Sequence, residues 1–314
     1  MKCGWLLAWE DLVMLTEQQL EQRLNYVTGS DASVICGVSP WGNIIDLWRQ
    51  KLGLAEQEDI SWKPAIKAGN YLEPVVAEWF SDETGKLCEV DMEFKISKAH
   101  PFMAGNIDRR ITNENAILEC KTTSRDDNWG DIGDNTIPDY YLCQCAHYAA
   151  VCDVDRVYIA VLIRGSDFRW YTYERNQKLE DIIITKEKAF WECVKTETPP
   201  EPRTPDEVIS LYAQAIDDNP LVADECIEEY IEQLKINKQN LKSIEEANKI
   251  CETRIKSFMK NHDILHGKDG KPKVTWKNAK GAVRFDAKKF AEDHEKLYEQ
   301  YLKTGQPSRR FIIK

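Results

Sequence analysis

The stretch from Gly105-Asn106-Ile107-Asp108 to Glu119-Cys120-Lys121 sets the architecture of this chain, because its aspartate and glutamate stand eleven residues apart with a turn between them. The turn is the polar run Thr112-Asn113-Glu114-Asn115, and apolar residues lie on either side of it. Polar runs between short apolar segments are typical of turns that join two strands. We expect a hairpin that brings Asp108 and Glu119 side by side at one end of a sheet.

This hairpin would deliver two carboxylates and an amine to one place. Lys121 lies two residues beyond Glu119 and therefore projects from the same face of the strand. The carboxylate oxygens of Asp108 and Glu119 suit Mg²⁺ or Mn²⁺, and the amine would lie next to a water that the metal activates. The pattern predicts metal-assisted hydrolysis of a phosphodiester.

The alternative is a chance D…E-x-K pattern, because 30% of the residues are charged. The run Leu118-Glu119-Cys120-Lys121 favours a site, since it places two charges in an otherwise apolar strand. Charges on a buried strand cost free energy unless they are paired or bound to a metal.

Length and composition allow one large domain with an appendage, or two domains, because the chain has 314 residues of which 42% are hydrophobic. No apolar run approaches the roughly 20 residues that cross a bilayer, so we expect no membrane association. The apolar run within Met1–Trp9 is too short for a signal peptide. Ten cysteines without a secretion signal predict a reducing, cytoplasmic location.

The cysteines do not predict a metal centre. Cys143, Cys145 and Cys152 lack the paired C-x₂-C spacing of zinc sites. On a helix, Cys143 and Cys145 point to different faces. We expect neither structural zinc nor an iron–sulfur cluster.

The net charge of −11 is unusual for a protein that binds DNA, but the charge is unevenly distributed. Residues 235–314 contain 20 Lys and Arg and 10 Asp and Glu, whereas residues 1–234 contain 22 and 43. A basic region can contact phosphate while the rest of the chain stays acidic. Basic C-terminal helices also serve solubility alone, so this favours DNA binding only weakly.

Hydrophobic periodicity and breaker residues predict the elements and two domains. The predicted core covers residues 1–200 and combines helices with a sheet. Its helices span 16–26, 30–37, 43–52, 64–84, 138–151 and 176–194. Its strands span 87–97, 101–112, 116–122, 156–163 and 168–174. A proline-rich linker leads to an appendage over 206–314, with a helix at 224–262, a turn at 267–270, a β ribbon at 272–285, a helix at 286–303 and a strand at 310–313.

Two features inside these elements need comment. Pro74 lies within the helix predicted over 64–84, where it would kink the helix or break it near Leu72-Glu73. The helix predicted over 224–262 has a heptad character carried by Ile227, Ile231, Leu234, Leu241, Ile244, Ile250 and Ile255.

Further side chains are candidates for the site, each with an alternative. Glu73 lies on a helix that would pack against the sheet, so it either joins the metal site or is a solvated residue beside Pro74. Gln144 and Tyr148 share one helical face, so both could face the strand that bears Glu119 and Lys121. Gln144 either holds Lys121 or a DNA phosphate, or it is a surface glutamine beside a core tyrosine. His147 is expected to be a packing or surface residue.

Two further groups suggest nucleic-acid contacts. Ser30 or Asp31 is expected to cap a short helix, where backbone N–H groups form an anion seat that Arg23 would join. The alternative is an ordinary helix cap with an unrelated arginine. Tryptophans at positions 41, 48, 62 and 129 are candidates for stacking on bases. Only Trp129, in the long polar loop 124–136, is expected to be exposed.

Several motifs then fall into one order. They are Arg23-Leu24, Thr28-Gly29-Ser30-Asp31-Ala32, Gly37-Val38-Ser39-Pro40-Trp41, Leu47-Trp48, Gly69 with Leu72-Glu73-Pro74, Gly105-Asn106-Ile107-Asp108, Glu119-Cys120-Lys121, and Gln144 with Tyr148. This order resembles the YqaJ-like viral recombinase family, relatives of bacteriophage lambda exonuclease. The resemblance covers about residues 20–195 and leaves the tail open.

The resemblance implies a PD-(D/E)xK nuclease fold of the restriction-endonuclease type, with a mixed central sheet flanked by helices. It implies a Mg²⁺-dependent 5′→3′ exonuclease acting on double-stranded DNA ends. By position, Asp108, Glu119 and the Cys120 carbonyl would bind metal, and Lys121 would activate or orient the water. Glu73 and Gln144 would complete the catalytic site.

The resemblance also implies partners and a location. Arg23 and Ser30 match positions that hold the DNA 5′-phosphate. The implied assembly is a ring-shaped homotrimer that works with a phage single-strand annealing protein in the cytoplasm of the host bacterium. Two alternatives stay open: an endonuclease of the same fold that cuts branched or single-stranded DNA, and a non-catalytic DNA-binding or assembly module.

Overall fold

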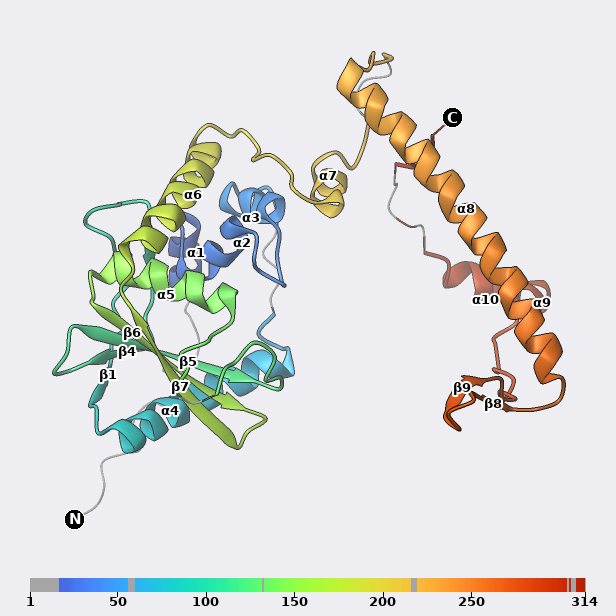
Figure 1. Ribbon diagram of the computed structural model, residues 1–314. Coiled ribbons are helices and arrows are strands. Elements are labelled where there is room, and N and C mark those ends of the chain that lie inside the picture. Colours follow the sequence, from blue (N-terminus) through green and yellow to red (C-terminus); the bar gives the residue numbers. More distant parts are fainter. Residues whose placement is uncertain are drawn as a thin grey trace. The chain divides into compact units, whose positions relative to one another are not determined.

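The computed structural model describes residues 17–55, 60–131, 133–215, 219–303, 305 and 309–313. It separates into two compact units, Met1–Tyr212 and Ala213–Lys314. Figure 1 shows the elements of both. The segment Met1–Trp9, whose apolar run is too short for a signal peptide, lies outside the described residues. Among the described residues, no helix has the length and apolar character needed to cross a membrane.

The first unit is built on a mixed sheet of five strands in the order β1-β4-β5-β6-β7. Strands β5 and β6 run parallel, and the other neighbouring pairs are antiparallel. The expected mixed central sheet is therefore confirmed. The strands of this sheet are β1 (Cys88–Val90), β4 (Arg109–Ile111), β5 (Ala116–Thr123), β6 (Arg156–Ile163) and β7 (Asp167–Glu174).

Helices cover both faces of this sheet, as expected for strands that are apolar on both sides (Figure 1). Helix α4 (Pro64–Thr84) packs on one face, where Val76 and Phe80 contact Leu118. Helix α5 (Asp139–Cys152) packs on the other, together with Ile117. Because side chains alternate along a strand, the face that carries Ile117 also carries Glu119 and Lys121.

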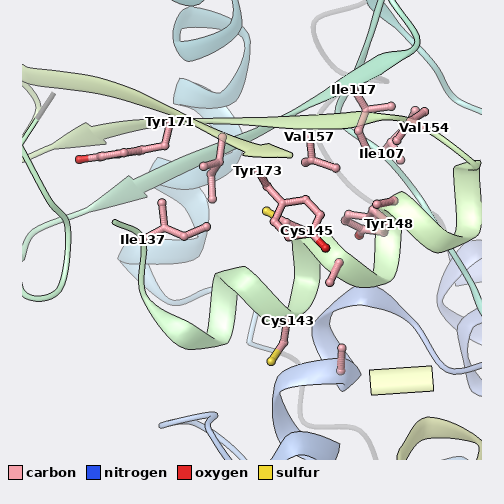
Figure 2. Close-up of a cluster of buried hydrophobic side chains, with 14 of the residues drawn as sticks. Ile107, Ile117, Ile137, Cys143, Cys145, Tyr148, Val154, Val157, Tyr171 and Tyr173 are labelled. Carbon is pink, nitrogen blue, oxygen red and sulfur yellow. The ribbon is translucent and has the colours of Figure 1, made fainter. Parts of the chain in front are cut away.

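Figure 2 shows how α5 meets the sheet: Cys145 and Tyr148 point toward the strands, whereas Cys143 points away. Cys143 instead contacts Cys36 of α2 (Gly29–Cys36). The expectation that Cys143 and Cys145 point to different faces is confirmed. The cysteines of the described residues are free thiols, and the expected absence of a cysteine metal centre stays a prediction.

Helices α2 and α6 (Gln177–Lys195) pack on the outer side of α5, and α3 (Ile44–Lys51) packs on α2 and α6. A third cluster joins Val27, Ile35, Ile45, Trp48 and Phe190. Val27 pairs with Met103, next to the small β2–β3 sheet. The elements involved are α1 (Glu17–Leu24), α3 (Ile44–Lys51), β2 (Lys95–Ile96), β3 (Ala104–Gly105), α6 (Gln177–Lys195) and α7 (Pro205–Leu211).

Pro74 neither breaks nor ends its helix, because α4 runs without interruption from Pro64 to Thr84. Because proline has no backbone N–H, the helix loses one hydrogen-bond donor at position 74. Packing of Val76, Ala77 and Phe80 against the sheet outweighs this loss. Gly85 ends the helix in the left-handed conformation at φ 69°.

The second unit contains α8 (Glu225–Met259), β8 (Ile264–His266), β9 (Pro272–Thr275), α9 (Ala287–Asp293) and α10 (Glu295–Gln300). Three expectations were wrong here. The β ribbon pairs β8 with β9 across the turn at 267–270 and does not extend to 285. The helix expected over 286–303 is interrupted at His294. The described residues 310–313 form no strand.

The division between the two units falls after Tyr212. Helix α7 lies in the first unit, where the Glu207 carboxylate accepts hydrogen bonds from the backbone N–H groups of Ile44 and Arg203. The segment 206–212, which the sequence predicts to belong to the appendage, therefore packs on α3.

Candidate active site

Strands β4 and β5 bring the two predicted carboxylates together. Arg109 pairs with Leu118, and the next step of this antiparallel register places Asp108 beside Glu119. Asp108 Oδ2 accepts a hydrogen bond of 2.7 Å from the backbone N–H of Cys120. The Asp108 carboxylate is therefore fixed against the strand that carries Glu119 and Lys121.

Glu119 is the centre of the polar contacts on this face of the sheet. Its Oε1 lies 2.6 Å from Lys121 Nζ and accepts a hydrogen bond of 2.9 Å from Gln144 Nε2. Gln144 also contacts the Tyr148 hydroxyl at 3.5 Å. The Gln144 amide thus holds the Glu119 carboxylate and not Lys121, and a contact of Gln144 with a DNA phosphate stays a prediction.

Glu73 reaches the site through a salt bridge. Its Oε1 lies 2.7 Å from Arg109 Nη1, and Arg109 also donates to the Asp108 carbonyl at 2.6 Å. Burial, and then the charge of Asp108, raise the pKa of Glu73. Glu73 is thus a half-buried member of the same charge cluster, and it is tied to Arg109.

The carboxylates of this cluster are held in an environment that disfavours their charge. Burial, followed by the nearby Asp108 charge, raises the pKa of Glu119 to about 7. Burial likewise raises the pKa of Asp108. Burial opposes the charge on Lys121, but Glu119 and Asp108 together hold its pKa above the usual range. Such a concentration of buried negative charge favours binding of a cation.

The donors present fit a hard divalent cation. Carboxylate oxygens from Asp108 and Glu119 and the backbone carbonyl of Cys120 are the oxygen ligands that Mg²⁺ and Mn²⁺ prefer. Within the described residues, no group of three or more His, Cys, Asp or Glu side chains is arranged to hold a metal ion. Mg²⁺ sites in proteins usually keep several waters beside one or two carboxylates.

A second polar site lies at the start of α2. Arg23 Nη2 donates to Ser30 Oγ at 2.9 Å and lies 3.4 Å from Thr28 Oγ1. Thr28, which the sequence predicts only as part of a motif and not as a cap, is the N-cap, in place of Ser30 or Asp31. The T-x-x-D spacing of a capping box was the signal that identifies it. Because Arg23 bonds to Ser30, it is not an unrelated arginine.

A buried ion pair supports this second site. Lys51 Nζ lies 2.7 Å from Asp31 Oδ2 and donates to the backbone carbonyls of Arg23 and Tyr26. Burial opposes the charge on Asp31, but Lys51 holds the pKa of that carboxyl below its usual range. Asp31 also accepts hydrogen bonds from the Thr28 N–H and hydroxyl. The buried Lys51–Asp31 pair and these hydrogen bonds therefore hold the turn that carries Arg23, Thr28 and Ser30 in place.

Tyr148 connects the two sites. A Cβ added at Gly29 would lie 2.6 Å from the Tyr148 ring, and one added at Gly105 would lie 2.7 Å from it. Both glycines therefore leave room for this ring. The Tyr148 hydroxyl contacts Gln144, which in turn holds Glu119.

The expectation for the tryptophans was wrong. Trp129 is only 7% exposed, because its ring packs between Tyr141 and Tyr171 at 5.4 Å from each. Trp41 is 71% exposed and contacts Tyr140, and Trp62 is also exposed. The 124–136 loop is polar in sequence, and the aromatic rings that cover Trp129 come from outside this loop.

His147 has a structural role. Its ring is fully buried, with Nδ1 2.8 Å from Glu187 and Nε2 3.1 Å from the Ala104 carbonyl. Both ring nitrogens are thereby occupied, and they tie α5 to α6 and β3.

Comparisons with known proteins agree with the sequence motifs. The sequence profile of the YqaJ-like viral recombinase domain matches residues 18–155. The YqaJ protein of Bacillus subtilis (strain 168) is 31% identical over 308 residues, which cover 96% of this chain and 95% of that protein.

Solved structures were also compared. The alkaline exonuclease LHK-Exo from Laribacter hongkongensis has a TM-score of 0.49 and 17% identity over 58% of this chain and 94% of its own. A putative exonuclease from Eubacterium rectale has a TM-score of 0.45 and 11% identity over 67% of this chain and 96% of its own. The identity and coverage shared with the Bacillus protein establish that this chain belongs to the YqaJ-like viral recombinase family.

Proposed function

We propose that this chain is a metal-dependent deoxyribonuclease that degrades one strand of double-stranded DNA from its 5′ end in phage-type recombination by single-strand annealing. The observation that carries the proposal is the buried Glu119 carboxylate, held beside Asp108 by Lys121 and Gln144. Membership of a viral recombinase family supports it. The reaction is hydrolysis of a phosphodiester.

Asp108, Glu119 and the Cys120 carbonyl would hold Mg²⁺, with Mn²⁺ as a substitute. A cation bound there would supply Lewis-acid stabilisation of the charge that develops on the phosphate oxygens. The oxygen donor set supports this choice of metal.

The chain's own residues position the reacting groups. Lys121 Nζ would donate a hydrogen bond to the attacking water and hold it in line with the scissile bond. Gln144 keeps the Glu119 carboxylate in one orientation through its 2.9 Å hydrogen bond. Arg109 offsets the charge of Glu73 at 2.7 Å, which limits repulsion of the phosphate. Preorganised polar groups of this kind need little rearrangement as the reaction proceeds.

Arg23, Thr28 and Ser30 supply the donors for a terminal 5′-phosphate. Their guanidinium and hydroxyl groups converge at the N-terminus of α2, where backbone N–H groups also favour an anion. Tyr148 lies against both this turn and Gly105 and contacts Gln144. A strand anchored by its 5′ end would thus lead toward Glu119, which supports 5′→3′ polarity.

The assembly and the partner are proposed from the family resemblance. We expect a ring-shaped homotrimer that encloses the duplex and acts with a phage single-strand annealing protein. We place this activity in the cytoplasm of the host bacterium, and the free cysteines support a reducing compartment.

A digestion assay tests the proposal. Linear duplex with a 5′-phosphate and a label at either end is incubated with Mg²⁺, with a covalently closed circle of the same sequence as a parallel substrate. The proposal predicts acid-soluble release that begins at 5′ ends, stops on chelation and spares the circle. Cleavage of the circle would favour the endonuclease alternative, and DNA binding without any release would favour the non-catalytic module.

A further inference from the structure

Helix α8 carries an exposed seam whose positions recur every seven residues. Position a of the repeat is occupied by Ile227, Leu234, Leu241, Asn248 and Ile255, and position d by Tyr230, Asn237, Ile244, Cys251 and Phe258. These residues, called here the α8 seam, are exposed in the second unit except for the half-buried Leu234. Met259 is the buried residue of this 35-residue helix.

An isolated helix of this kind gains little from its own contacts. Its ion pairs Lys235–Glu232 and Lys256–Glu252 are exposed and contribute little. Helices in proteins are stabilised mainly by packing of their apolar face. A seam with a seven-residue repeat is typical of a coiled coil. Three further exposed isoleucines of α8, Ile231, Ile236 and Ile250, lie outside the seam. The seven-residue repeat of the seam indicates another helix as the partner.

The α8 seam is complementary to itself in the antiparallel direction. When a second copy of α8 runs in the opposite direction and the two helices are centred between Leu241 and Ile244, every a residue of one copy lies opposite a d residue of the other. The resulting layers pair Leu241 with Ile244, Asn237 with Asn248, Leu234 with Cys251, Tyr230 with Ile255, and Ile227 with Phe258. The two polar positions meet each other in this alignment, so their amides can exchange hydrogen bonds and do not face hydrocarbon.

The flanking charges favour the antiparallel direction over the parallel one. In the antiparallel alignment Lys238 lies beside Glu245 of the second copy, and the pair occurs twice by symmetry. In a parallel, in-register pair the corresponding neighbours are Gln233 with Lys238 and Asn240 with Glu245, which form no ion pair. Charged residues beside a coiled-coil seam set the orientation of the partners.

We propose that α8 binds α8 of a second copy of this chain as an antiparallel coiled coil. The interface is isologous, so it closes with two copies. At 1.5 Å per residue the helix is about 52 Å long, and the seam extends along most of it. This association does not depend on the proposed nuclease activity or on a ring formed by the first unit.

Disulfide formation in the full-length chain tests the orientation. In a Leu234→Cys variant, the new thiol should pair with Cys251 of the second copy and give a covalent dimer on mild oxidation. The two positions lie about 25 Å apart within one helix, so they cannot pair within one chain. Adding Cys251→Ser should abolish the dimer. Persistence of the dimer in that double variant, or a Cys251-dependent dimer of the wild type, would indicate parallel pairing and overturn the proposal.

A matched pair of substitutions tests the seam itself. Ile244 in the seam and Ile250 outside it are equally exposed, at 58% and 59%. In light scattering and in the Leu234→Cys crosslinking assay, Ile244→Lys should weaken self-association at least tenfold, and Ile250→Lys should leave it unchanged. Equal effects of the two changes, or the absence of any crosslink through Cys251, would refute the proposal and favour packing of the seam on the first unit or on another protein.

Discussion

Lys121 Nζ lies 2.6 Å from the same Glu119 oxygen that accepts the hydrogen bond from Gln144. The ammonium group thereby compensates a buried carboxylate, which would otherwise carry a large desolvation cost. The same contact keeps the Lys121 amine close to any group that the Glu119 carboxylate binds. One contact therefore serves both the stability of this strand and the proposed chemistry.

The raised pKa of Glu119 predicts a pH-dependent stability. Burial, and then Asp108, raise this pKa from 4.5 to about 7, so the folded chain holds the proton more tightly than the unfolded chain. The contribution is fully present below pH 4.5 and is lost as the pH rises through 7. In EDTA, the unfolding free energy of wild type minus that of Glu119→Gln should fall by about 2–3 kcal/mol between roughly pH 5 and 8.

Urea denaturation at several pH values measures this difference. Adding Mg²⁺ at the higher pH should restore stability to the wild type but not to Glu119→Gln, because a bound ion stabilises the folded state. A constant difference across the pH range would contradict the account of Glu119.

The Arg23 and Ser30 contacts predict a preference for phosphorylated ends. Arg23→Ala should raise KM for 5′-phosphorylated duplex by about 10- to 100-fold, the range for loss of a hydrogen bond that involves a charged group. The KM for 5′-hydroxyl ends should change little, since these lack the anion. Steady-state digestion of matched substrates measures both values. An equal effect on both kinds of end would assign Arg23 to general DNA binding.

The buried Lys51–Asp31 pair predicts a large stability effect. Lys51→Met leaves the Asp31 charge unpaired inside the protein, so the unfolding free energy should drop by about 3–5 kcal/mol. Lys195→Met is the matched control, because its pair with Glu192 has the same 2.7 Å separation but is exposed. This control should lose less than about 1 kcal/mol. Similar losses in the two variants would show that Lys51 is not a structural support of the α2 turn.

The close approach of Gly105 to Tyr148 predicts a steric effect. A Cβ at position 105 would lie 2.7 Å from the Tyr148 ring, and this ring is buried. Gly105→Ala should therefore destabilise the fold by about 1–3 kcal/mol. Tyr148→Leu in the same chain should recover part of that loss, as thermal unfolding can measure. Additive losses would rule out a clash with this ring.

Much of the core was predictable because its side-chain periodicities are regular. Alternation along β5 put Glu119 and Lys121 on one face, and their contact is observed. The helix predicted over 64–84 has the bounds of α4, despite Pro74. In these elements the hydrophobic pattern is strong, and packing on the sheet outweighs a single unfavourable residue.

Other features depend on contacts between distant segments, which local patterns do not contain. The sequence predicts that Gln144 faces the strand of Glu119 and Lys121, but it does not decide which of the two Gln144 contacts, because that strand lies 25 residues earlier. Trp129 was expected to be exposed because its neighbours in sequence are polar, but the rings that bury it come from α5 and β7. In the second unit, the predicted ribbon was too long. Its second strand ends at Thr275, and residues 276–285 form no strand.

The most direct test of the central claim is the rate of acid-soluble release from 5′-phosphorylated linear duplex in Mg²⁺, for wild type, Asp108→Asn, Lys121→Met and the surface control Lys195→Met. The account predicts that the Asp108 and Lys121 variants lose at least about 10²-fold in rate while remaining folded, and that the control matches wild type. Wild-type protein that releases no nucleotides, or folded Asp108 and Lys121 variants that digest DNA at the wild-type rate, would contradict it.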